Sequence, residues 1–139
     1  MRCFLSTLSI LLVLPLAASA QDGPRGIAFV QAPENSSGMA MGRTPAEGFA
    51  AATAQCVDGG AYAEDCIPTN WCFPAGWSVV IFLMHQEGIH WHEVACGLAS
   101  EDVALSVGGA MCNLDDRPYL TDCTLAQVYD PEGKPQIDY

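Results

Sequence analysis

The sequence has 139 residues, and 16 acidic against 5 basic side chains give a formal net charge of −11 at pH 7. Half of the residues (50%) are hydrophobic, which is enough apolar material for the core of one domain, and the length is short for two. So acidic a chain is repelled by the phosphates of nucleic acids and by anionic lipid head groups, which excludes nucleic acid as the expected partner. Cationic partners, metal ions among them, are electrostatically easier.

Residues 1–20 have the pattern of a cleavable signal peptide. Arg2 supplies a positive start, an apolar run extends from Phe4 to Ala17, and Ala18-Ser19-Ala20 is a small-x-small cleavage site. A membrane anchor is the alternative, but the run is too short to cross a bilayer comfortably. We therefore expect a mature chain without a membrane span, located in the periplasm or secreted.

After this segment the same order of elements is predicted twice: strand, strand, helix, strand. Extended segments are indicated by alternating or continuous apolar residues between turn-forming ones. In chain order they are 26–31, 38–41, 66–72, 77–85, 89–96 and 123–129.

The two helices have clear start signals. Thr44-Pro45-Ala46-Glu47 is a capping box with proline at the first helical position, and this helix ends near Cys56. The second helix begins at Ser100, with acids in its first turn. It contains Gly108 and Gly109, which cost roughly 1 kcal/mol each relative to alanine, so we expect this helix to approach a sheet closely.

The doubled pattern predicts an α+β fold. Two β-β-α-β repeats are expected to form a mainly antiparallel sheet covered by two helices and stabilised by disulfides. Residues 21–130 would make this single domain, and residues 131–139 a flexible tail.

Six cysteines follow the signal peptide, and an even number in an exported chain favours a disulfide framework. A zinc site is the alternative, but the chain has no C-x-x-C pair. Six cysteines allow fifteen connectivities. Because Cys56 and Cys66 align with Cys112 and Cys123, pairing within each repeat is the simplest choice, and it leaves Cys72 for Cys96.

The doubled pattern of hairpin, alanine-rich helix ending in cysteine and "DC" strand start resembles the bacterial domain-of-unknown-function family 4189, over residues 26–129. The resemblance implies an exported, disulfide-stapled domain and carries no established activity. The segment CIPTNWCFPAGW and the histidine-rich hairpin depart from the family pattern. The residues that carry the resemblance are Gly42, Ala50, Ala54, Cys56, Cys66, Gly97, Ala110, Cys112 and Cys123.

All three histidines lie in the second predicted hairpin, with two acids beside them. His90 and His92 point to the same face of a strand, because side chains alternate. Two such imidazoles are a common way for a strand to hold zinc or copper. We therefore consider a metal site on His90 and His92, with His85, Glu87 or Glu93 as a further ligand. The alternative is a structural role, as half-buried and hydrogen-bonded histidines.

The turn of this hairpin decides where His85 lies. A two-residue turn would pair His85 with His90 but would need positive φ at Glu87. A three-residue loop at 86–88 with left-handed Gly88 fits better and separates His85 from the pair. The alignment of the halves further predicts that the histidines lean toward the helix-covered side of the sheet.

An exposed aromatic patch at Trp71, Phe73 and Trp77 is a second candidate binding site, although packing in the core or at its rim, beside Cys72, is the favoured use of these residues. No nucleophile or phosphate-loop motif is found in the sequence, which favours a non-enzyme. We therefore expect an exported binding domain whose partner is an unknown protein or cell-envelope component. A periplasmic metal-binding protein is the alternative, and a metal-dependent hydrolase is a further one.

Overall fold

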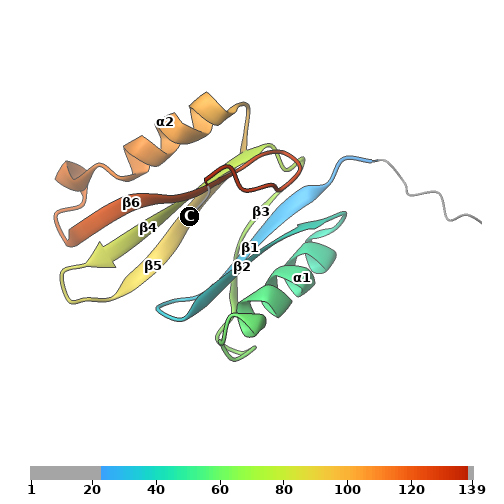
Figure 1. The fold of residues 1–139 in the computed structure, drawn as a ribbon, viewed down its shortest axis with the longest axis horizontal. Helices are drawn as coiled ribbons and strands as arrows, with labels where there is room; N and C mark the ends of the chain where they lie inside the picture. Colours follow the sequence, from blue (N-terminus) through green and yellow to red (C-terminus); the bar gives the residue numbers. More distant parts are fainter. Residues whose placement is uncertain (1–22, 138–139) are drawn as a thin grey trace, which may run out of the picture.

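The computed structural model describes residues 23–137, so the expected signal peptide lies outside the described residues. Figure 1 shows the arrangement of the elements. In chain order they are β1 (Gly26–Ala32), β2 (Ser36–Gly42), α1 (Pro45–Asp58), β3 (Ile67–Cys72), β4 (Trp77–His85), β5 (His90–Leu98), α2 (Glu101–Met111), a short 3-10 helix η1 (Leu114–Asp116) and β6 (Leu120–Tyr129).

The strands form two antiparallel sheets of three strands each, with the orders β2-β1-β3 and β5-β4-β6. The α+β fold is therefore as predicted, but the strands divide between two sheets where one was expected. Each half of the chain builds one sheet, and in both halves the first strand of the half is central.

The two sheets and two helices stack as four layers. α1 covers the outer face of the β2-β1-β3 sheet, and α2 covers the outer face of the β5-β4-β6 sheet, so the helices lie on opposite sides of the molecule (Figure 1). The inner faces of the sheets pack against each other around Ile27, Phe29 and Ala75. A site between the sheets is thus lined by residues from both halves.

Small residues let each helix lie close to its sheet. α1 buries Gly48, Ala52 and Cys56 at a spacing of four, and α2 buries Ala104 and Gly108 at the same spacing. A Cβ on Gly108 would lie 2.9 Å from Val79 Cγ2, so the predicted close approach is confirmed there. Gly109 differs, because a Cβ would have no neighbour within 4 Å.

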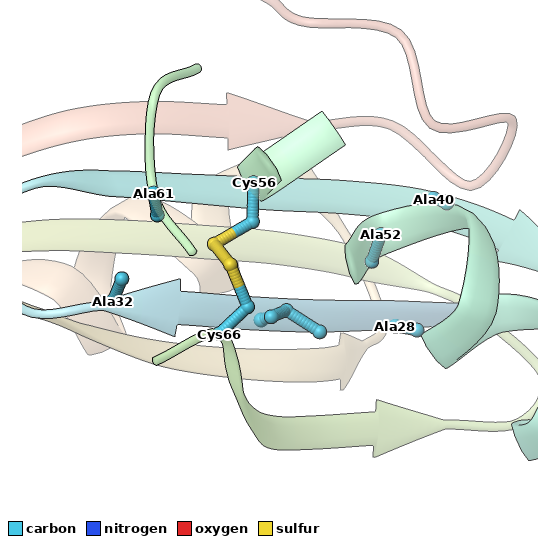
Figure 2. Packing of buried hydrophobic residues seen from close by; sticks show 8 residues of the cluster. Ala28, Ala32, Ala40, Ala52, Cys56, Ala61 and Cys66 are labelled. Atoms are coloured by element: carbon cyan, nitrogen blue, oxygen red, sulfur yellow. A yellow bond between two sulfur atoms is a disulfide. The ribbon is translucent and has the colours of Figure 1, made fainter. Parts of the chain in front are cut away.

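Three disulfides join the expected pairs: Cys56–Cys66, Cys72–Cys96 and Cys112–Cys123. The first connects the last turn of α1 to the residue before β3, and the third connects the C-cap of α2 to the fourth residue of β6. Figure 2 shows Cys56–Cys66 among the alanines that α1 and β1 bury between them. The second disulfide is different in kind, because it links β3 of one sheet to β5 of the other.

The predicted tail is described as far as Ile137, and that part folds back along β6. A turn at 130–134 brings Pro135 opposite Tyr129. The side-chain amide of Gln127 then accepts a hydrogen bond from Ile137 N–H and donates one to Ile137 C=O, at 2.9 Å each. The Ile137 side chain packs against the core under α2, so these residues belong to the domain.

Candidate ligand groove between the sheets

The β4–β5 hairpin has the three-residue loop that the sequence favoured. The His85 amide donates to the Ile89 carbonyl at 2.7 Å, and Gly88, with φ of 88°, donates to the His85 carbonyl at 2.8 Å. His85 is therefore opposite Ile89, and Met84 is the residue that pairs with His90.

His90 and His92 share a face of β5, as predicted, but this face lies toward the other sheet and not toward the helix. Val94 and Cys96 continue the same face and pack in the core between the sheets. On β4, Phe82 is opposite His92, and its ring centroid lies 5.5 Å from that of His90 and 5.8 Å from that of His92. The expectation that the histidines lean toward the helix-covered side is thus wrong, because the opposite face of β5 packs under α2.

The other proposed metal ligands lie elsewhere. Glu93 is on the α2 side of β5, where its carboxylate accepts from Arg117 at 2.9 Å and from the Trp91 indole at 3.3 Å. Glu87 is at the tip of the hairpin, with a side chain that is 73% exposed.

His85 is held at the base of the hairpin loop. Its Nδ1 accepts from the Glu87 amide at 3.1 Å, and its ring lies 5.7 Å from that of Tyr119. Within residues 23–137, no three His, Cys, Asp or Glu side chains come together as a metal site.

The backbone of His92 is bound by a side chain of the other sheet. The Gln31 amide group accepts from His92 N–H and donates to His92 C=O, both at 3.0 Å. Asn70 of β3 adds a bond to the Val94 carbonyl at 3.3 Å. Together with the Cys72–Cys96 disulfide, these bonds fix the outer edge of β5 against the first sheet.

A cavity of about 160 Å³ is lined by residues of both sheets; we call it the inner cavity. Its wall is largely apolar, with polar groups from several elements, and the described residues that line it include no Asp, Glu, Lys or Arg. Its lining residues are Phe29, Val30, Gln31, Ser37, Gly38, Met39, Gln55, Thr69, Val80, His92, Val94 and Tyr129.

A second cavity, the outer cavity, also measures about 160 Å³ and adjoins the first at Gln31, Ser37 and His92. It lies between His90 and the β1–β2 turn, and Glu34 is the one acidic or basic side chain among the described residues that line it. The two cavities together form what we call the inter-sheet groove. His92 lies at their junction.

Burial lowers the pKa of His92 below its ordinary value, and the neighbouring His90 lowers it further. The imidazole is therefore neutral at physiological pH, with one nitrogen able to donate and the other able to accept. Within residues 23–137 its ring nitrogens have no hydrogen-bond partner, whereas Nδ1 of His85 has one. This ring is thus a polar group of the groove that can both donate to and accept from a ligand.

The three aromatic residues of the predicted patch do not share one exposed surface. Trp71 packs under α1, with its ring 6.3 Å from that of Phe49. Trp77 packs in the core under α2. Phe73 alone is well exposed, at 54%, so packing accounts for the other two side chains.

Sequence reasoning missed most of the groove. Gln31 and Phe29 line it from β1, and Tyr129 lines it from β6, at the other end of the described chain, so nothing local in the sequence brings them together. One signal was present: Gln31 is a polar residue in an otherwise apolar strand, and such a side chain has to find a partner.

Comparisons with known proteins give no relative: no family model, no curated protein and no solved structure matches this chain.

Proposed function

We propose that this protein is an exported binding domain that takes an uncharged apolar group of its ligand into the inner cavity. The observation that carries the proposal is the cavity itself, which is apolar, set between two rigidly joined sheets, and flanked by an unpaired imidazole. Cavities with apolar walls and a few convergent polar groups are the usual ligand sites of proteins.

The volume limits what can enter. A cavity of about 150 Å³ lined by apolar side chains accommodates benzene, and the inner cavity is of this size at about 160 Å³. The group that binds is therefore a single aromatic ring or a branched aliphatic chain. A larger ligand would place only one such group inside and leave the rest in the outer cavity or in solvent.

The charges of the groove select among ligands of this size. Glu34 is the one acidic or basic side chain among the residues of segment 23–137 that line the two cavities, and the whole protein is strongly acidic. A cationic group next to the apolar one is attracted by this field, and a carboxylate or phosphate is repelled. The preferred ligand is thus neutral or cationic.

The export part of the proposal rests on the predicted signal peptide and on three disulfides, which persist in oxidising compartments. Neither helix within residues 23–137 is long and apolar enough to cross a membrane. The proposal also places the protein in the periplasm or outside the cell, and it takes a protein or an envelope component as the source of the ligand. Membership of family 4189 is a further part of the proposal.

The test uses benzylamine and benzoate, two probes with the same ring and opposite charges. We expect calorimetry on the mature protein to detect benzylamine binding, with much weaker binding of benzoate. Val80→Phe fills the cavity and should abolish binding, whereas Val103→Phe, on the exposed face of α2, should not. Equal binding by the two variants would refute the proposed site.

A further inference from the structure

Four side chains form a compact group on the inner face of the β4–β5 hairpin. Register places Phe82 opposite His92 and Met84 opposite His90. Side chains alternate between the two faces of β4, and Ile81 and Leu83 are fully buried on the face under α2. Met84 therefore lies on the opposite, inner face. A thioether and two imidazoles therefore share one surface.

The hydrogen-bond pattern shows that Phe82–His92 and Met84–His90 are non-hydrogen-bonded pairs, which have the shorter Cα–Cα distance. His92 directs its N–H and C=O outward to Gln31, so the Phe82–His92 pair exchanges no backbone bonds. Hydrogen-bonded and non-hydrogen-bonded pairs alternate in antiparallel strands. Met84–His90, two residues further along, is therefore a non-hydrogen-bonded pair as well. Side chains in such pairs lie nearest to each other, with Cα atoms about 4.5 Å apart.

The potential ligand atoms in this group are not engaged elsewhere. Within residues 23–137, no hydrogen bond involves a ring nitrogen of His90 or His92, and both residues are only partly buried. The nearest acid along β5, Glu93, points to the opposite face and is held by Arg117. The donors on this face of the hairpin are thus nitrogen and sulfur. Glu34 lines the outer cavity with His90 and His92, but within residues 23–137 it forms no three-residue metal cluster with them.

We propose that Met84, His90 and His92 bind one Cu(I) ion. Thioether sulfur selects soft cations and imidazole nitrogen suits copper, whereas magnesium, calcium and manganese prefer oxygen ligands. The Phe82 ring, close to both imidazoles, shields one side of the ion and attracts positive charge through its π face.

This ion site goes beyond the proposed function, because it does not need an organic ligand in the inner cavity. It also differs from the ligand set suggested by the sequence. Met84 replaces His85, Glu87 and Glu93 as the third ligand, and of the two metals considered from the sequence, zinc and copper, copper is kept, as Cu(I).

The test is a titration of the mature, disulfide-bonded protein with Ag(I), a redox-inert analogue of Cu(I), followed by competition for Cu(I) under ascorbate. We expect one equivalent to bind, and Met84→Leu and His90→Gln to weaken affinity by about tenfold or more. Matched controls are Met41→Leu, beside Gly133, and His85→Gln, whose ring contacts Tyr119; both should bind as the wild type does.

A wild-type measurement covers the case in which a variant fails to fold. Ag(I) should shift the NMR signal of the Met84 methyl group and leave that of Met41 in place. An unshifted Met84 signal, or binding of Zn(II) without Ag(I), would overturn the proposal. Val80→Phe should still bind Ag(I), so a failed ion site and a failed cavity are distinguishable.

Discussion

The side-chain amide of Gln31 on β1 forms two 3.0 Å hydrogen bonds with the backbone of His92 on β5. The Gln31 side chain thus forms the two backbone hydrogen bonds that a residue of an adjacent strand would form with His92. An edge strand has unpaired backbone groups that invite association with another chain, and here one position of the β5 edge is closed from within the molecule. The same contact positions the His92 ring at the junction of the two cavities.

Gln31→Ala should therefore destabilise the fold, because it leaves two backbone groups of His92 without partners. We expect a loss of about 1–3 kcal/mol in the free energy of unfolding, measured with denaturant. Gln55→Ala is the matched control, since Gln55 is exposed and, among the described residues, its side chain accepts a single hydrogen bond, from Met39 N–H at 3.1 Å. A larger loss in Gln55→Ala than in Gln31→Ala would contradict the role given to Gln31.

The pKa of His92 predicts how stability changes with pH in metal-free protein. Burial and the neighbouring His90 lower the pKa of His92 in the folded state, whereas the pKa of this residue in the unfolded chain is about 6.5. Below that pH the unfolded state binds a proton that the folded state does not, so stability falls until the folded pKa is passed.

His92→Gln removes this titration, and its unfolding free energy should decline less steeply between about pH 7 and pH 5 than that of the wild type. Denaturant unfolding at several pH values, with a chelator present, measures both slopes. Equal slopes would show that the environment of His92 does not affect its protonation. Both proteins in this comparison retain the residues that surround position 92, namely Phe82, Gln31 and Glu34.

Two adjacent glycines of α2 should respond oppositely to alanine. At Gly109 a Cβ has open space, so Gly109→Ala should stabilise the protein by about 0.5–1 kcal/mol through helix propensity. At Gly108 a Cβ meets Val79, whose branched side chain has little freedom to move, and overpacking should exceed the gain in propensity. Thermal unfolding of the two variants gives the sign of each effect, and the same sign for both would contradict the packing of α2.

Ser78 on β4 is fully buried, and its hydroxyl has no hydrogen-bond partner among the described residues. Burying such a group costs free energy, so Ser78→Ala should be at least as stable as the wild type, by up to about 1 kcal/mol. Thr69→Val is the comparison, because the Thr69 hydroxyl donates to the Phe29 carbonyl at 3.1 Å. Marked destabilisation by Ser78→Ala would indicate a partner for its hydroxyl.

Local features of this fold could be predicted from the sequence. Thr44 and Ser100 cap their helices by accepting from the Glu47 and Val103 amides, as their positions indicate. The loop at 86–88 follows from the conformational freedom of glycine. These signals are carried by residues close together in the chain.

The remaining features depend on contacts between distant segments. Alternation placed His90 and His92 on one face but could not say whether a helix or a second sheet covers it. The same uncertainty hid the division into two sheets and the contact of Gln31 with His92, which are 61 positions apart. Trp71 and Trp77 were candidates for exposure because nothing local showed which helix each one packs under.

The location of bound benzylamine in the mature protein tests most directly whether the inter-sheet groove is a ligand site. We predict NMR contacts between the ring protons of benzylamine and the methyl groups of Val80 and Val94, with shifts at the His92 ring. Contacts confined to the exposed Phe73, or shifts scattered over the surface, would contradict the proposed function.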